Sequence, residues 1–155
     1  MRKNKSAIII GIIIFVGLGF LFALPKINDP SRSLAQVWQS AGVDCLSSHN
    51  RANLHIHPEL QILVDGTSEV IPGSVGITKS CMAEVHTHDA TGVIHLESVL
   101  VSKQFTLSDF FAVWGKDLTR PGFELELTVD GEPSQEFGNL ILKDHQKIIL
   151  RYTHK

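Results

Sequence analysis

The chain contains little sulfur and no excess of basic charge. Only two of its 155 residues are cysteine and two are methionine. Because Cu(I) prefers thiolate and thioether ligands, this composition disfavours a Cu(I) site. Lysine and arginine number 14 against 16 aspartate and glutamate residues, which gives a formal charge of −2. No basic stripe marks a nucleic-acid-binding surface, so we expect no nucleic-acid partner.

One long segment near the N-terminus lacks charge altogether. It extends from Ser6 to Leu24, is rich in Ile, Phe and Gly, and follows Arg2, Lys3 and Lys5. Its length is close to the ~20 residues that span a bilayer and exceeds the ~7–15 residue core of a signal peptide. No Ala-x-Ala cleavage site and no cysteine for lipid attachment follow it. We therefore predict an uncleaved membrane anchor, with a cleaved signal peptide as the alternative.

The basic flank also predicts the topology of the chain. By the positive-inside rule the N-terminus lies in the cytoplasm, so everything after Pro25 is extracytoplasmic in a single-pass protein of the cell membrane. Without the three basic residues of the flank, the chain carries 11 basic and 16 acidic residues, a formal charge of −5 that suits cation capture. The predicted segments are 1–24 (flank and anchor through residues 6–24), 25–42 (linker and short helix) and 43–155 (outer domain).

The two cysteines, Cys45 and Cys81, both fall on the predicted outer side. A disulfide is the default in an oxidising compartment. It would close a loop of about 37 residues and stabilise the domain by about 4 kcal/mol in the chain-entropy model. It would also bring the segment before His55 close to the strand that carries His86. The alternative is that Cys81 is a thiolate ligand for a metal.

Histidine is concentrated in one part of the chain. Six of the eight histidines fall between His49 and His95, and five of these six belong to tight clusters. Residues i and i+2 of a strand share a face, so each His-x-His pair directs two imidazoles into one space. Imidazole is the commonest protein ligand for transition metals, and we predict a site for divalent copper or zinc. The predicted ligands are His55, His57, His86, His88 and His95.

The second and third histidine clusters are predicted to lie on one hairpin. A run of turn residues, Asp89 to Gly92, separates them. Directly opposed residues share a face, with Cβ atoms roughly 4.5–5.5 Å apart. The expected opposite pairs are His88 with Val93, His86 with His95, and Glu84 with Glu97.

Alternation along this hairpin predicts which side chains the domain buries. Val85, Ile94 and Leu96 should point into the core, while the histidines line an open or partly covered groove. A bulge would turn His95 to the opposite face and end the three-histidine site.

Three functions fit this ligand set. The first is a metal-binding protein in which Asp89 or Glu97 orients an imidazole. The second is an enzyme with an open metal position, where Glu97 or Glu84 acts as general base on metal-bound water. The third is a metal-free module that shows a polar histidine face to a protein partner of unknown identity.

The remaining pattern predicts an α+β domain with one mixed or antiparallel sheet and one or two short helices, in a β-grasp-like arrangement. Asp65-Gly66 and Asp130-Gly131 each follow an alternating strand and predict tight hairpins. A capping box opening at Ser33 predicts one short helix, which Gly42 ends. Thr106 caps a second helix, which Gly115 ends.

Several of these motifs together resemble an uncharacterised family of proteins with one N-terminal membrane segment and a small outer domain. The resemblance covers roughly residues 43–153 and implies a shared domain without bringing an activity. The motifs that carry it are His55-x-His57, Gly76-Ile77, Cys81, the run from His86-Thr-His-Asp to His95-Leu-Glu-Ser98, and Thr106-Leu-Ser-Asp-Phe-Phe-Ala-Val-Trp-Gly115.

Overall fold

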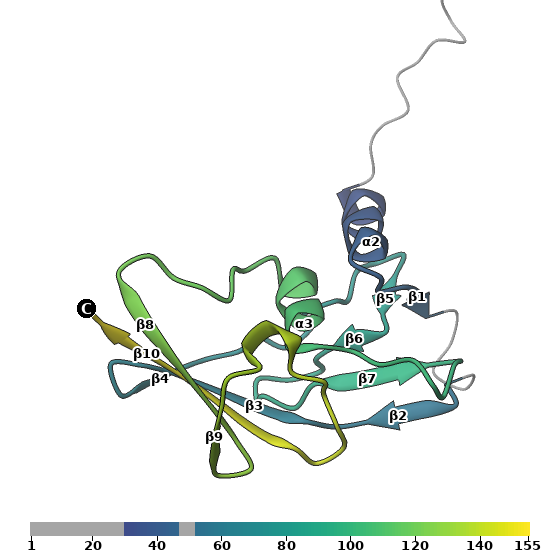
Figure 1. Cartoon of the computed structure of the whole chain (residues 1–155). Coiled ribbons are helices and arrows are strands. Elements are labelled where there is room, and N and C mark those ends of the chain that lie inside the picture. The colour runs from purple at the N-terminus through teal and green to yellow at the C-terminus, as the bar shows by residue number, and fades with distance from the viewer. Residues whose placement is uncertain (1–29, 47–51) are drawn as a thin grey trace, which may run out of the picture.

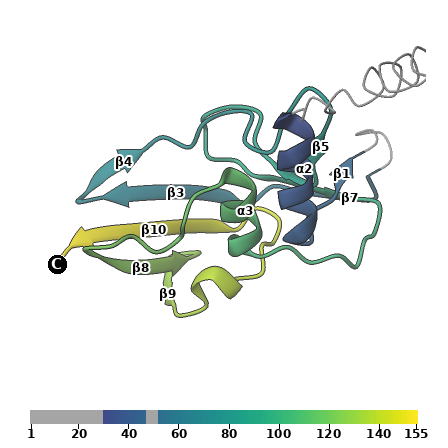
Figure 2. The ribbon, with the colours of Figure 1, turned by 90° about the horizontal axis from the view of Figure 1, so that it is seen from above.

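The three longest strands of the described residues belong to a five-stranded mixed sheet in the computed structural model, which describes residues 30–46 and 52–155 (Figure 1). Two hairpins flank a central strand that is parallel to β3 and antiparallel to β8, in the order β4-β3-β10-β8-β9. Figure 2 shows β3 and β10 side by side beneath α3. The strands are β3 (Glu59–Val64), β4 (Thr67–Glu69), β8 (Phe123–Val129), β9 (Glu132–Ser134) and β10 (Lys147–His154).

Both predicted Asp-Gly hairpins are confirmed. Asp65 and Gly66 join β3 to β4 with φ angles of 49° and 81°, and Asp130 and Gly131 join β8 to β9 with φ angles of 51° and 90°. Positive φ at both central residues matches the twist of the flanking strands, and aspartate and glycine tolerate it better than other residues.

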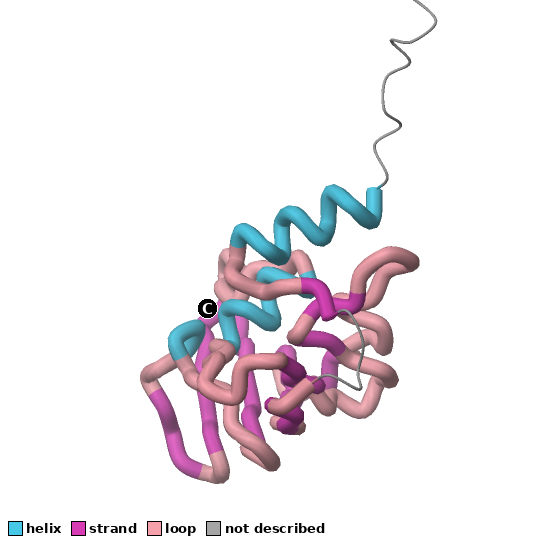
Figure 3. The backbone as a smooth tube through the Cα atoms, turned by 90° about the vertical axis from the view of Figure 1, so that its right-hand side faces the viewer, coloured by secondary structure: helices cyan, strands magenta, loops and turns pink. Residues whose placement is uncertain are grey.

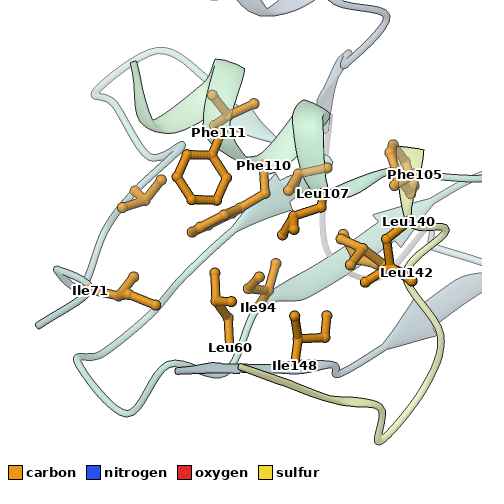
Figure 4. Packing of buried hydrophobic residues seen from close by; sticks show 14 of the residues in the cluster. Leu60, Ile71, Ile94, Phe105, Leu107, Phe110, Phe111, Leu140, Leu142 and Ile148 are labelled. Atoms are coloured by element: carbon orange, nitrogen blue, oxygen red, sulfur yellow. The ribbon is translucent and has the colours of Figure 1, made fainter. Parts of the chain in front are cut away.

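Helix α3 (Leu107–Trp114) covers one face of this sheet. Thr106 and Asp109 form a reciprocal capping box, and Gly115 ends the helix in the left-handed conformation, as the sequence predicts. Phe110 is fully buried and points toward Leu60 of β3 and Ile148 of β10 (Figure 4). Apolar burial between helix and sheet therefore forms the centre of the core.

Helix α2 (Pro30–Ser40) begins one turn earlier than the sequence predicts. Ser33 lies inside the helix and does not cap it, because proline is already suited to the first helical turn. Gly42, with φ of 82°, follows its end as expected. The Trp38 side chain is buried, and its indole Nε1 donates a hydrogen bond to the Val113 carbonyl over 3.1 Å. This contact fastens α2 to α3, and Figure 3 shows the helices gathered on one side of the strands.

Two small sheets are built mainly from the segment between β4 and α3. One is the three-stranded sheet β2-β7-β6 and the other pairs β1 with β5. The remaining elements are β1 (Cys45–Leu46), β2 (Leu54–Ile56), β5 (Met82–Ala83), β6 (Val85–His86), β7 (His95–Ser98) and the 3-10 helix η2 (Phe137–Asn139).

The predicted disulfide between Cys45 and Cys81 is confirmed, with a Cα–Cα distance of 5.3 Å. It joins the start of β1 to the residue before β5 and holds these two strands together. The alternative prediction that Cys81 is a thiolate ligand is wrong, because its sulfur is already bonded.

No helix within residues 30–46 and 52–155 is long and apolar enough to cross a bilayer. The predicted anchor, residues 1–24, lies outside the described residues, as does His49.

Gly92 lets the tip of the histidine hairpin lie against β3. The Leu60 amide donates to the Gly92 carbonyl over 2.9 Å. Gly92 has a φ of +88°, and a Cβ atom added to it would lie 2.3 Å from the Leu60 carbonyl oxygen. Gly131 has nearly the same φ, +90°, but nothing lies within 4 Å of the equivalent position.

This contrast predicts unequal effects of two alanine substitutions. Gly131→Ala should cost only the strain of a left-handed alanine, about 1 kcal/mol. Gly92→Ala should cost about 1–3 kcal/mol more, because backbone must move to make room for the new methyl group. Urea unfolding of both variants tests this, and equal losses would show that the hairpin tip is not in close contact with β3.

Candidate metal centre

The three-stranded sheet brings the predicted histidines together from both sides of β7. His95 pairs with His86 on β6, and Glu97 pairs with His55 on β2. The predicted register of the hairpin, His86 opposite His95, is therefore confirmed. His57 directly follows β2, and His88 lies two residues beyond the end of β6. Backbone pairing thus places imidazoles from both edge strands around the central one.

His95 is the centre of the resulting cluster. Its ring centroid lies between 4.5 and 5.9 Å from those of the four other predicted ligands. Within each His-x-His pair the two Nε2 atoms are close, 3.1 Å for His55 and His57 and 3.2 Å for His86 and His88. All five predicted ligands therefore belong to one cluster.

His86 is fully buried, whereas the sequence predicted that it would line an open or partly covered groove. The ring of His86 is shielded from solvent, whereas His88 on the same face is exposed. The His86 Nδ1 lies 2.9 Å from the Ala83 carbonyl, which can only accept, so Nδ1 is the donor. In the neutral ring, Nε2 then keeps its lone pair for a ligand. Burial lowers the pKa of His86 from 6.5 to about 4, so the ring is neutral near pH 7.

His95 is half-buried, and its Nδ1 atom is available to bind a ligand. Its Nδ1 is shielded from water and has no hydrogen-bond partner among the described residues. Burial first, and then the charges of neighbouring imidazoles such as His88, lower the pKa of His95 from 6.5 to about 4. Buried polar atoms normally find partners, and a metal ion is one explanation for an unsatisfied imidazole nitrogen.

Glu97 lies beneath the histidines. Its side chain is 2% exposed, and its Oε1 atom is 3.3 Å from the His55 Nε2 and 3.9 Å from the His86 Nε2. Asp89, the other acid expected to orient an imidazole, lies exposed in the turn, where its carboxylate accepts from the Thr91 amide over 3.0 Å. Of these two acids, only Glu97 is within ion-pair distance of the clustered imidazoles.

Glu84, which the enzyme hypothesis offers as a general base, is directed elsewhere. Its carboxylate accepts from the Asp44 amide over 3.0 Å and from the Ser98 hydroxyl over 2.7 Å, and it pairs with Lys103. The expected pairing of Glu84 opposite Glu97 is present between the backbones, where the Glu97 amide donates to the Glu84 carbonyl. The Glu84 side chain instead holds the segment before β1 in place through the Asp44 amide.

Thr87 has a role that the sequence reasoning missed. Its hydroxyl donates to the Pro72 carbonyl over 2.8 Å and accepts from the Val75 amide over 3.1 Å, and its backbone pairs with Ser74 and Val75. These bonds fix the backbone between His86 and His88. The alternation of side chains along an extended segment could have predicted this role, because a residue between two ligands points to the opposite face, toward the interior.

The spacing of the imidazoles fits a metal ion. Two nitrogens bound to one tetrahedral zinc lie about 3.3 Å apart, given bonds of ~2.05 Å. Both Nε2–Nε2 distances are close to this value. Ligand atoms of His86, His88, His95 and Glu97 lie within 4.8 Å of one another, as do those of His55, His57 and His95. The cluster therefore offers the donors that divalent transition metals prefer.

The buried imidazole of His86 predicts a pH-dependent stability of the metal-free chain. Its pKa is about 4 when folded against 6.5 for the free side chain, so the unfolded chain binds the proton more tightly between these values. Stability should therefore fall as the pH drops through 6.5, by about 2 kcal/mol between pH 7 and 5 for this residue. Urea unfolding at both pH values tests this, and His86→Gln should flatten the dependence. Parallel curves for variant and wild type would contradict it.

Comparison with known proteins supplies no relative from which a function could be transferred. No family model matches the chain, and no match was found among the curated proteins or the solved structures.

Proposed function

We propose that this protein is a membrane-anchored, extracytoplasmic metal-binding protein that takes divalent copper or zinc at its histidine cluster. The observation that carries the proposal is the convergence of four imidazoles on the ring of His95 from β2, β6 and the segments that follow them. Neutral imidazole nitrogens and a carboxylate suit Cu(II) and Zn(II) better than Cu(I).

Two features favour metal binding over display of a polar surface. His86 and Glu97 are buried, so neither can be shown to a protein partner. In addition, the His95 Nδ1 has no hydrogen-bond partner in the described part of the chain, a cost that a bound ion would remove. A metal-free module therefore explains this arrangement less well than a metal site.

An enzyme is the second candidate, and the exposure of the site favours it. The His55 side chain is 51% exposed and His88 is exposed, so solvent reaches one side of the cluster. An ion that keeps an open position there could activate a water molecule. Glu97 is placed to accept a proton beside the imidazoles of His55 and His86.

The placement of the domain belongs to the same proposal. The uncharged run from Ser6 to Leu24 would anchor the chain, with the disulfide-bonded domain on the oxidising side of the membrane. The sheet order, with two hairpins around a parallel central pair, supports a β-grasp-like scaffold. The resemblance to proteins with one membrane segment and a small outer domain fits this placement.

Metal binding predicts a stabilisation that depends on His95. Zinc or copper at 100 times its dissociation constant should raise the unfolding free energy of the metal-stripped, full-length chain by about 2.7 kcal/mol. His95→Ala should weaken binding at least about tenfold, because His95 contributes to both ligand groups. Urea unfolding with and without metal, in a mild detergent, measures both effects.

His154→Ala is the matched control. His154 is 67% exposed, pairs with Asp65 and belongs to neither ligand group. It should therefore respond to metal as the wild type does. An equal response of wild type and His95→Ala, or no response in either, would contradict the proposed function.

A further inference from the structure

We infer that the histidine cluster holds two metal ions, with the Glu97 carboxylate between them. The inference rests on the proposed function and adds the number of ions and the group that joins them. Candidate ligands among the described residues form two groups that share only His95. The groups are His86, His88, His95 and Glu97, and His55, His57 and His95.

Each His-x-His pair has the spacing that one ion requires. The Nε2 atoms are 3.1 Å apart in the pair of His55 and His57, and 3.2 Å apart in the pair of His86 and His88. Nitrogens on one tetrahedral ion are about 3.3 Å apart. Each pair is therefore preformed for an ion of its own.

The two pairs belong to opposite edges of the three-stranded sheet. β2 and β6 both pair with β7, so two strand spacings, about 9.5 Å, separate their backbones. All ligand atoms of one tetrahedral ion lie about 3.3 Å from one another. The candidate ligand atoms accordingly fall into two groups, one for each pair, and atoms within each group lie within 4.8 Å of one another. Two ions about 3.5–4 Å apart suit this division.

Glu97 is placed to join the two ions. Its Oε1 atom lies 3.3 Å from the His55 Nε2 and 3.9 Å from the His86 Nε2, so one carboxylate faces an imidazole of each pair. A carboxylate has two oxygens and can bind one ion with each. Its side chain is 2% exposed, and a carboxylate buried to this degree is stabilised when cations lie beside it.

His95 completes the first group and contacts the second. Its ring centroid is 4.5 Å from that of His88 and 4.7 Å from that of His57. An ion bound by His86 and His88 would then have four protein ligands with His95 and Glu97, whereas an ion bound by His55 and His57 would have fewer. The second ion, next to the half-exposed His55, would therefore keep a position for water or a small oxyanion.

Metal content per chain tests this inference. The full-length chain, purified in a mild detergent and stripped with a chelator, is loaded with Zn(II) and desalted before elemental analysis. We expect two ions per wild-type chain, two in His154→Ala and one in the double variant His55→Ala, His57→Ala. Both substituted side chains of the double variant are at least one-third exposed, so it should fold, and its circular dichroism should match that of the wild type.

Loading with Cu(II) tests the bridge. Two copper ions about 4 Å apart couple magnetically, so the wild type should give an electron paramagnetic resonance spectrum of a coupled pair. Glu97→Gln keeps the shape of the side chain but removes its charge, and should lose the coupled signal or one of the two ions. The double variant should give the spectrum of a single isolated copper.

The outcomes distinguish failure of the two-ion site from failure of the proposed metal-binding function. One ion per wild-type chain would overturn the dinuclear site and leave the proposed function intact. No bound metal would overturn both. Two ions whose copper spectra are uncoupled, or a second ion that is lost in His154→Ala, would also overturn the bridged site.

Discussion

Antiparallel pairing of β7 with β2 on one side and β6 on the other fixes where every candidate ligand lies. Because paired residues share a face and the side-chain period of a strand is two, the register His86 opposite His95 and His55 opposite Glu97 gathers all of them on one face. A shift of one residue in either pairing would turn the two histidines of that edge strand to the opposite face. The neighbouring contacts of the domain can be understood as holding this register.

Three supports hold the register from outside the small sheet. Thr87 binds the segment between His86 and His88 to residues 72–75. The Cys45–Cys81 disulfide holds β1 to β5, and Ala83 of β5 accepts the hydrogen bond that orients the His86 ring. The third support is the contact of the hairpin tip with β3. Each joins the site to a separate part of the scaffold, and His86 is held buried and oriented as a result.

Features that depend on residues close in sequence could be predicted. The two Asp-Gly hairpins, the Thr106 cap and the His86–His95 pairing all depend on contacts within about a dozen residues, where backbone geometry leaves few alternatives. The start of α2 was predicted one turn too late, because Pro30 and Ser33 are both residue types that commonly begin a helix. The contact of Glu84 with Lys103 could not be predicted, because Lys103 lies 19 residues away on another segment.

The sequence by itself determined the ligand types, their pairing within each His-x-His motif and the face on which each pair lies, because the period of a strand is a local property. Only the tertiary structure decided that the pair at His55 meets the pair at His86, that His86 is buried, and that Glu97 lies between the two pairs. These features depend on which strands flank β7 and on what covers the sheet. Both depend on packing between segments far apart in sequence, such as β2 and β7, which no local pattern encodes.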